Sequence, residues 1–441
     1  MTVKSLNMIL FAAILILGSC AGRQPEHVVN VQLNEISLEN APAINSYAFA
    51  THGGDWLILG GRIDGLHDHR PEKAYPPDSS NRRIWVMDVK GNRLWAKDIY
   101  DLPLNLSDQL QSTNMAFYQD GHRLVLIGGY GWSREKNGHI TFPFLTVVNV
   151  PDLIAAVKSG DDPVEYFTQI HHEKMAVSGG YLGKMGTEYL LVFGNRFDGR
   201  YSTRPNAEHQ QEYTHEIRKF ELAQDGDKYR INAYEAEHDS IHFHRRDFNM
   251  LPQIFPNGDY GYTVFSGVFQ YDRNFPWLYP VDITPSGYRP ITGFDQKFSH
   301  YHGACVSMYS EESKQMANLF FGGMARFVPD PETGEIINDP LVPSVNTISQ
   351  VTRFADGSLT ENVLDVKMPG LLGASAGFIP AQNLSFSKGT LIDYDKLPAG
   401  KNLIGYIYGG LESSHPNVFL QPKGVSTSTA RLFEVYAVKP E

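Results

Sequence analysis

Residues 314–327, KQMANLFFGGMARF, form an apolar run that ends in two consecutive glycines and continues with an arginine. The same pattern occurs elsewhere in the chain. Clear copies are DWLILGGR (55–62), HRLVLIGGY (122–130) and NLIGYIYGGL (402–411), and weaker copies are EYLLVFGNR (188–196) and GYTVFSGV (261–268). A recurring unit indicates a repeat architecture, because one unit cannot bury its own hydrophobic face without neighbours.

The spacing of the copies gives the size of the unit. The second small residue of each copy falls at 61, 129, 195, 267, 323 and 410, which gives steps of 68, 66, 72, 56 and 87 residues. Each copy follows a short strand and a turn, and pairs of strands split by DGD, DGS or KGN come after it, which is typical of hairpins. Almost no segment except 151–159 has a helical period. The sequence therefore predicts four strands repeated six times.

This pattern resembles the kelch family of β-propellers, whose repeat carries an apolar strand that ends in Gly-Gly. The resemblance covers nearly the whole chain after its first twenty residues, and it implies an all-β, six-bladed kelch-type β-propeller with four-stranded antiparallel blades. We expect the stretch HVVNVQLNEISLE (27–39) to supply a strand to the last blade and so to close the ring, which removes exposed sheet edges. A seventh blade within the 87-residue step is the alternative to one blade with an insertion.

Composition restricts the partners. Of 441 residues, 49 are acidic and 38 are Lys or Arg, so the net charge of −11 argues against a nucleic-acid partner, which needs a concentrated basic face. The apolar fraction of 42% is enough for a packed core. The two cysteines are Cys20 and Cys305, and the first is the predicted acylation site, so we expect no internal disulfide. Separately, we expect the protein to be a monomer.

The first twenty residues predict an export signal. Lys4 precedes the apolar run MILFAAILIL (8–17), which is too short for a mature membrane-spanning helix, and Gly18, Ser19 and Cys20 follow. LGSC resembles the lipobox of bacterial lipoproteins. The resemblance implies a signal peptide at 1–19, a single domain at 20–441, and fatty acyl chains such as palmitate on Cys20. Ala21 after the cysteine implies the bacterial outer membrane, and a plain secretory signal is the alternative.

Long polar loops follow the Gly-Gly strands, and in propellers of this type they open on one face. Loop length concentrated on one face marks a working surface. Three of these loops begin with an arginine at or near the same point of the repeat: Arg62, Arg196 and Arg326. Guanidinium groups gathered at the mouth of the channel would bind a carboxylate or phosphate. Alternatively, each arginine holds only its own loop.

The segments SIHFHRRDFN (240–249) and SHYHGAC (299–305) lead into the innermost strands of the fourth and fifth units. Each carries two histidines spaced i, i+2, so that each pair shares a face of an extended strand: His242 with His244, and His300 with His302. The four imidazoles could bind a transition metal such as zinc or copper. The alternative is hydrogen-bonded histidines between blades.

The same segments supply other candidate ligand contacts. Arg245, Arg246 and Asp247 lie where the chain meets the channel, and His302, in the segment that enters the next innermost strand, is a further candidate. Tyr130 follows a Gly-Gly pair and could stack on a sugar ring. An inter-blade salt network is the alternative for the arginines and the aspartate.

Two functions remain open at this point. The first is a lipid-anchored propeller that binds a carbohydrate or protein ligand through its long-loop face. The second is an enzyme, since six-bladed kelch proteins of bacterial envelopes include sialic acid epimerases, which act on an anionic sugar. No catalytic motif in the sequence distinguishes the two.

Overall fold

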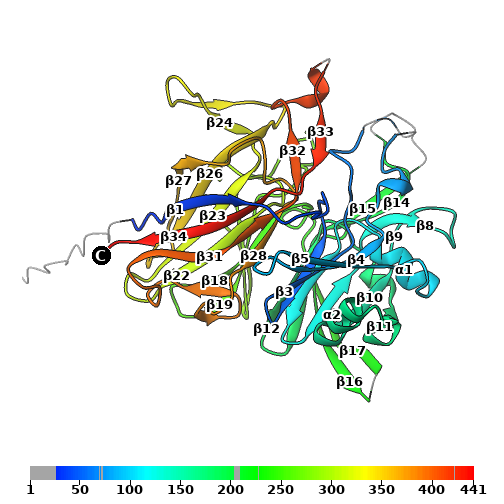
Figure 1. Cartoon of the computed structure of the whole chain (residues 1–441). Helices are drawn as coiled ribbons and strands as arrows, with labels where there is room; N and C mark the ends of the chain where they lie inside the picture. The colour runs from blue at the N-terminus through cyan, green and yellow to red at the C-terminus, as the bar shows by residue number, and fades with distance from the viewer. Residues whose placement is uncertain (1–25, 69, 71–72, 203–208, 227, 422) are drawn as a thin grey trace, which may run out of the picture.

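The computed structural model describes residues 26–68, 70, 73–202, 209–226, 228–421 and 423–441. Its strands form six small antiparallel sheets arranged as the blades of a β-propeller (Figure 1). Both the fold class and the number of blades were predicted from the repeat. The predicted signal peptide (residues 1–19) and Cys20 lie outside the described residues.

The first three blades follow one another along the chain, each running from its innermost to its outermost strand. Blade 1 contains β2 (Ala48–His52), β3 (Asp55–Leu59), β4 (Arg83–Asp88) and β5 (Arg93–Asp98). Blade 2 contains β6 (Ala116–Asp120), β7 (Arg123–Ile127), β10 (Phe144–Asn149) and β11 (Phe167–His171). Blade 3 contains β12 (Tyr181–Met185), β13 (Glu188–Val192), β16 (Glu216–Asp225) and β17 (Lys228–His238).

The other three blades complete the ring. Blade 4 contains β18 (Asn249–Ile254), β19 (Tyr260–Phe265), β20 (Val281–Thr284) and β21 (Gly287–Pro290). Blade 5 contains β22 (Cys305–Ser310), β23 (Gln315–Met324), β26 (Ser344–Arg353) and β27 (Leu359–Lys367). Blade 6 contains β28 (Gly377–Pro380), β31 (Gly400–Tyr408), β34 (Leu432–Lys439) and β1 (Asn30–Ile36).

Blade 6 closes the ring as the sequence predicts. Strand β1 pairs antiparallel with β34 along its whole length, from Asn30 opposite Val438 to Ile36 opposite Leu432. The 87-residue step holds a single blade with an insertion, in which β29 (Phe386–Lys388) and β30 (Leu391–Asp393) form a hairpin. Strand β30 joins the inner strand of blade 5 in parallel, so the insertion ties two blades together.

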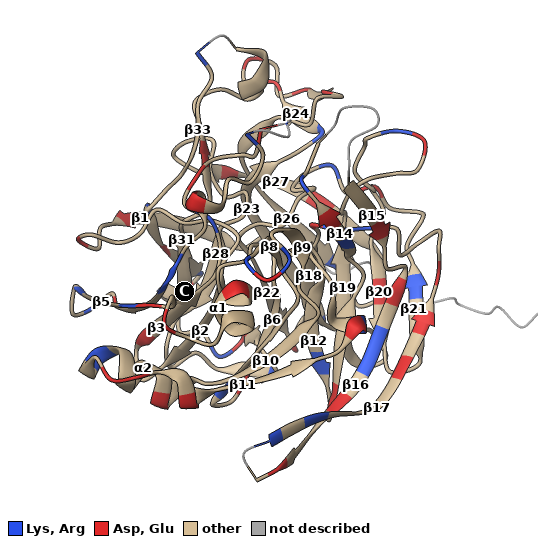
Figure 2. Ribbon diagram, turned by 90° about the vertical axis from the view of Figure 1, so that its right-hand side faces the viewer, with Lys and Arg blue, Asp and Glu red and all other residues tan. Residues whose placement is uncertain are grey.

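Hydrophobic clusters fill the space between neighbouring blades. Blades 6 and 1 share one that includes Trp56 and Tyr406, and blades 4 and 5 share a small one around Phe265 and Phe320. Clusters at the other four junctions complete the circle of contacts. The outer strand β17 carries four charged residues, Lys228, Arg230, Glu235 and Glu237, whereas the inner strands β18 and β22 carry none (Figure 2).

Helices are few. The predicted one is α2 (Val150–Ser159), whose apolar side packs on blades 1 and 2, and α1 (Leu104–Leu110) was not predicted. Single turns of 3-10 helix are η1 (Pro77–Ser79), η2 (Val164–Tyr166), η3 (Glu173–Met175) and η4 (Val418–Leu420). Within the described residues, no helix has the length and apolar character needed to span a membrane.

The loops between the second and third strands of each blade build up one face of the ring. Four of them carry a hairpin: β8 (Tyr130–Ser133) with β9 (Gly138–Thr141), β14 (Asn195–Gly199) with β15 (His209–Tyr213), β24 (Phe327–Pro329) with β25 (Ile336–Asn338), and β32 (Leu411–Ser413) with β33 (Ser426–Ser428). We call this side the long-loop face. The hairpins from blades 5 and 6 rise at the top of Figure 1.

Two residues in left-handed geometry end the second strand of a blade. In blade 2 they are Gly128 and Gly129, and a Cβ on Gly128 would lie 1.9 Å from the carbonyl oxygen of Val177 in the connection to the next blade. In blade 3, the structure corrects our alignment of Asn195 with the second glycine of the repeat. The left-handed pair of this blade is Phe193 and Gly194, with φ angles of +50° and +86°, whereas Asn195 already belongs to an extended strand.

Candidate functional site

A ring of six backbone hydrogen bonds surrounds the propeller axis where each chain segment enters its innermost strand. Each N–H in the ring donates to the carbonyl oxygen of the corresponding residue in a neighbouring blade, at distances from 2.8 to 3.3 Å. The members, in order around the ring, are Ser46, Ser375, His302, Asp247, Gly179 and Asn114. We call these six residues the axial ring. They bring together positions that are far apart in the sequence.

The axial ring forms the floor of a cavity of about 480 Å³ on the long-loop face. A second cavity of about 150 Å³ lies below it, among the inner strands, and is lined by aromatic residues such as Phe49 and Phe117. Five ring residues line both cavities: Ser46, Asn114, Asp247, His302 and Ser375. The axial ring therefore forms a polar constriction between the two cavities. The upper volume is typical of small-molecule sites.

Asp247 is the acidic residue on this floor, and its side chain is 9% exposed. It forms an ion pair with its neighbour Arg246, and the amide of Asn114 donates to its Oδ1 at 3.4 Å. Burial alone would lower the pKa of Arg246, but Asp247 and nearby tyrosines, Tyr213 first among them, raise it above its usual range. Arg246 therefore stays protonated, and the pair is close to neutral as a whole.

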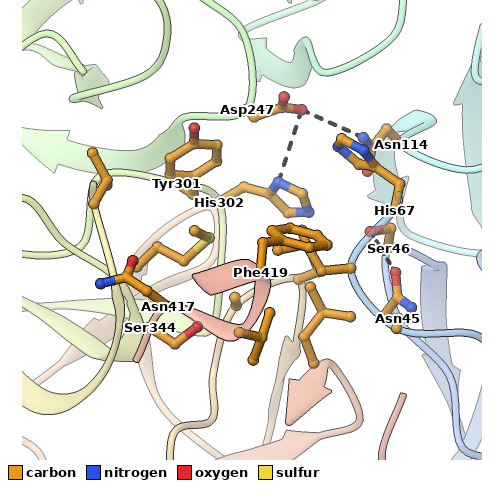
Figure 3. A pocket seen from close by; sticks show the side chains of 18 of the residues that line it. Asn45, Ser46, His67, Asn114, Asp247, Tyr301, His302, Ser344, Asn417 and Phe419 are labelled. Carbon is orange, nitrogen blue, oxygen red and sulfur yellow. Dashed lines mark hydrogen bonds and ion pairs between the residues drawn. The ribbon is translucent and has the colours of Figure 1, made fainter. Parts of the chain in front are cut away.

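His302 lies next to Asp247 on the ring, with 4.0 Å between Nδ1 of the histidine and Oδ1 of the aspartate (Figure 3). Burial lowers the pKa of His302, and Asp247 partly opposes that shift. The imidazole is therefore neutral at pH 7 and can both donate and accept a hydrogen bond. The Nδ1 atom lies at the edge of ion-pair distance from the carboxylate of Asp247.

Two polar atoms on the floor are buried without a hydrogen-bond partner in the described structure: Oδ1 of Asn114 and Nε of Arg246. The first is an acceptor and the second is a donor. Buried polar atoms of this kind cost free energy unless a partner arrives, and such exceptions are frequent at binding sites. A ligand group that both donates and accepts, such as a hydroxyl, suits this floor better than a purely acidic group.

Aromatic rings form the walls above the floor. Tyr75, Tyr201, Tyr301 and Phe269 all line the cavity. The ring of Tyr75 stacks with that of His67, with 5.0 Å between the ring centroids. The guanidinium carbon of Arg62 lies over the same tyrosine ring, 4.9 Å from its centroid. Burial raises the pKa of Tyr301, so its hydroxyl stays protonated at neutral pH. Flat apolar faces beside hydroxyl groups are suited to sugars.

Four of the sequence candidates line the cavity: Arg62, Arg246, Asp247 and His302. Arg62 is not available to an anion as it stands, because Asp64 binds its guanidinium through two oxygens, at 2.7 and 2.5 Å. Tyr130 lines only a small side pocket that adjoins the cavity, and its hydroxyl donates to the carbonyl oxygen of Gly199 at 2.8 Å.

The other three arginines are held away from the cavity lining. Arg196 is bound to Asp198 and Glu173 at 2.7 and 3.1 Å. Arg326 donates to Asn338 at 2.9 Å and lies over Phe275. Their offsets from the left-handed pair differ: Arg62 comes one residue after it, Arg196 two and Arg326 three. Because successive side chains of an extended chain point to opposite sides, the offset accounts for Arg196. Arg326 is held away by its bond to Asn338 and its packing on Phe275.

Arg245 is a structural residue of blade 4. Its side chain is fully buried, donates to the carbonyl oxygens of His242, Ser266 and Tyr279, and packs on Trp277. Burial lowers its pKa to about 10, which still leaves it charged at neutral pH. It does not line the cavity.

The four histidines do not converge. His242 contacts the hydroxyl of Tyr279, His244 contacts the ring of His215, and His300 is fully buried between a carbonyl and a backbone N–H. Among the described residues, no group of three His, Cys, Asp or Glu side chains is arranged to hold a metal ion. The i, i+2 spacing does not produce a shared site because these segments turn before their strands begin at Asn249 and Cys305.

Sequence reasoning missed much of the site. The missed residues are Ser46, Tyr75, Asn114, Tyr201, Tyr301, Ser375 and Phe419. A signal existed for the ring members, since each lies two or three residues before an innermost strand, as in NSYAFA and TNMAFY. The tyrosines come from loops whose paths the repeat does not define.

Comparisons with known proteins add little beyond the fold. No protein-family model matches the chain, and no curated protein sequence matches it. One solved structure that matches is that of YjhT, with a TM-score of 0.47 and 10% identity, over 89% of this chain and 96% of that chain. The class of the molecule rests on its own sheets and cavity: it is a six-bladed β-propeller with a cavity on its axis.

Proposed function

We propose that this protein binds a small, uncharged, hydroxyl-rich ligand, a carbohydrate or a close analogue, in the cavity above the axial ring. The single observation that supports this is the composition of the cavity. A polar floor with both donors and acceptors lies beneath aromatic walls, and the volume is that of a small-molecule site.

Charge balance favours an uncharged ligand over an anionic one. The two arginines of the cavity each have their own aspartate, Asp64 for Arg62 and Asp247 for Arg246. Breaking a buried pair to bind an anion would leave a carboxylate without its partner, which costs several kcal/mol, on the order of 3–5. A sialic acid-like substrate is therefore less well matched than a neutral sugar.

We further propose that the protein is a lipoprotein held at the bacterial outer membrane by acyl chains on Cys20. The lipobox-like LGSC sequence supports this. The direction of the strands would also keep the cavity mouth clear of the membrane. The fourth strand of a blade runs toward the long-loop face, so β1 begins at Asn30 on the opposite face, beside the end of β34 (Figure 1). The cavity mouth would then point away from the membrane.

Catalysis on the same ligand is a second candidate, favoured by the proximity of His302 to Asp247 on the cavity floor. A neutral imidazole beside a carboxylate is a frequent acid–base pair. Incubation of protein with each bound sugar, followed by NMR of the products, would separate turnover from simple binding.

The binding proposal is tested with a panel of neutral and acidic monosaccharides and their methyl glycosides. The protein would begin at Ala21, because every described contact lies within residues 26–441. Calorimetric titration should detect binding of at least one neutral sugar, weakened by His302→Ala. Binding confined to acidic sugars, or none across the panel, would count against the proposal.

A further inference from the structure

The upper part of the cavity differs in polarity from its floor. Toward the mouth, the walls are made by apolar side chains from the loops of blades 5 and 6: Met324, Leu341, Val342, Leu411, Val418, Phe419 and Leu420. The turn η4 supplies the last three of these residues. The polarity of the cavity therefore changes along the axis, from hydroxyls, amide and ions at the ring to hydrocarbon at the mouth.

Three of these side chains are unusually exposed for their size. Leu341 is 55% exposed, Phe419 is 50% exposed and Leu420 is 62% exposed. Scattered single exposed leucines need no explanation, but these three line one concave wall. Apolar surface left in water costs free energy in proportion to its area, and an apolar ligand group laid against it would recover that cost. We call Leu341, Phe419 and Leu420 the apolar lip.

We propose that the ligand is an amphiphile, with its hydroxyl-bearing head on the axial ring and an apolar substituent, such as an alkyl or aryl aglycone, against the apolar lip. This inference rests on the proposed function and narrows its substrate class. The lip is on the face opposite the start of β1, so on a chain anchored at Cys20 it would not be in contact with the anchoring membrane.

The direction of the ligand follows from this separation. The ring carries the groups that need hydrogen-bond partners, including the buried acceptor of Asn114, so the polar head must enter first. The apolar part then remains at the mouth, where its far end can reach solvent. A glycoside with its sugar on the floor and its aglycone outward satisfies both requirements.

The test uses methyl, butyl and hexyl β-D-glucopyranosides, in detergent-free solution below the concentrations at which the hexyl compound aggregates. Each fully buried methylene should tighten binding about fourfold, so the hexyl compound should bind at least tenfold more tightly than the methyl compound. The double variant Leu341→Ser, Leu420→Ser should lose most of this gain, measured within that variant as the ratio of its affinities for the hexyl and methyl glucosides.

A matched control comes from the same loop. Val425 is 55% exposed and apolar, but it does not line the cavity, so Val425→Ser should leave the dependence on chain length unchanged. Equal affinity for all three glucosides, or a gain that survives the double variant, would overturn the amphiphile proposal. If methyl glycosides bind and the alkyl chain adds nothing, only this inference fails. If no glycoside or free sugar binds, the proposed function fails with it.

Discussion

The backbone N–H of His302 donates to the carbonyl oxygen of Asp247 at 2.8 Å, and this bond joins the entry of blade 5 to the entry of blade 4. It is one of the six bonds of the axial ring. Because the ring fixes the backbone of each member, the side chains of Asp247 and His302 stay close although 55 residues separate them in the sequence. The geometry of the site thus depends on closure of the whole propeller.

A glycine in the ring leaves room for the aspartate. Gly179 has φ of +65°, and a Cβ there would lie 2.5 Å from Oδ1 of Asp247. We expect Gly179→Ala to displace the carboxylate and weaken sugar binding at least tenfold. Gly186→Ala is the control, because its φ is +61° and a Cβ there would contact nothing within 4 Å. The two variants share the backbone cost of about 1 kcal/mol, so equal binding by both would contradict this role for Gly179.

The junction of blades 4 and 5 depends on a buried ion pair as well as on its small hydrophobic cluster. Arg353 of β26 binds Asp282 of β20 at 2.5 and 3.1 Å, and both side chains are 1% exposed. Arg353→Met would leave Asp282 buried without this partner and should cost about 3–5 kcal/mol of unfolding free energy. Measurement by urea denaturation checks this value.

A second arginine on the same carboxylate provides the comparison. Arg289 reaches Asp282 at 3.3 Å, but its side chain is 66% exposed. Arg289→Ala should therefore cost no more than about 1 kcal/mol. A similar loss for the two variants would show that burial does not decide the strength of these pairs.

The stability of the protein should fall in mild acid because of His300. Burial lowers the pKa of this imidazole from 6.5 to about 4, and its Nδ1 accepts the N–H of Arg326 at 2.9 Å, so protonation would place two donors against each other. Between pH 6.5 and about pH 4, this histidine is protonated in the unfolded chain and neutral in the folded chain. Stability is thus lost as the pH falls through this window, on the order of 3 kcal/mol from this residue.

Comparison of thermal unfolding midpoints at pH 7 and pH 5 for the unmodified protein and for His300→Gln tests this. Glutamine can still donate to Gln296 and accept from Arg326, but it does not titrate. The variant should show the smaller drop between the two pH values. An identical drop would assign the acid sensitivity to other groups.

In the proposed lipoprotein, membrane attachment depends on the thiol sulfur of Cys20. In a Gram-negative host, Cys20→Ala should move the protein from the outer-membrane fraction to the soluble fraction, and it should abolish incorporation of labelled palmitate. Acyl chains contribute about 0.8 kcal/mol per buried methylene, so two or three of them hold a protein durably. Retention of Cys20→Ala in the membrane would contradict the anchor.

The repeat was sufficient to predict the architecture. The six apolar strands that end in small residues predicted the six blades. The additional strand-like segment at 27–39 predicted the closing strand β1. The repeat predicts the scaffold because every blade buries the same apolar strands against its neighbours. The helix α1 was missed because its seven residues are too few to show a helical period.

The site was harder to predict, for two physical reasons. Aligning Asn195 with a glycine shifts the repeat by one residue and places Arg196 on the opposite side of an extended chain from Arg62, while Arg326 lies two residues further along its loop than Arg62 does. Charge compensation is also invisible without coordinates. The aspartates that bind Arg62 and Arg246 are only two and one residues away in the sequence, yet their geometry decides whether an anion can bind.

The most direct measurement is the affinity of the best-bound neutral sugar for Asp247→Asn, determined by calorimetric titration beside the unmodified protein. A hydrogen bond to a charged group contributes about 1.5–3 kcal/mol, so we expect binding at least tenfold weaker, while Asp272→Asn in the neighbouring loop, where the side chain is 69% exposed, has no effect. Circular dichroism would verify that both variants are folded. Unchanged affinity in a folded Asp247→Asn protein would contradict the assignment of the axial ring as the ligand site.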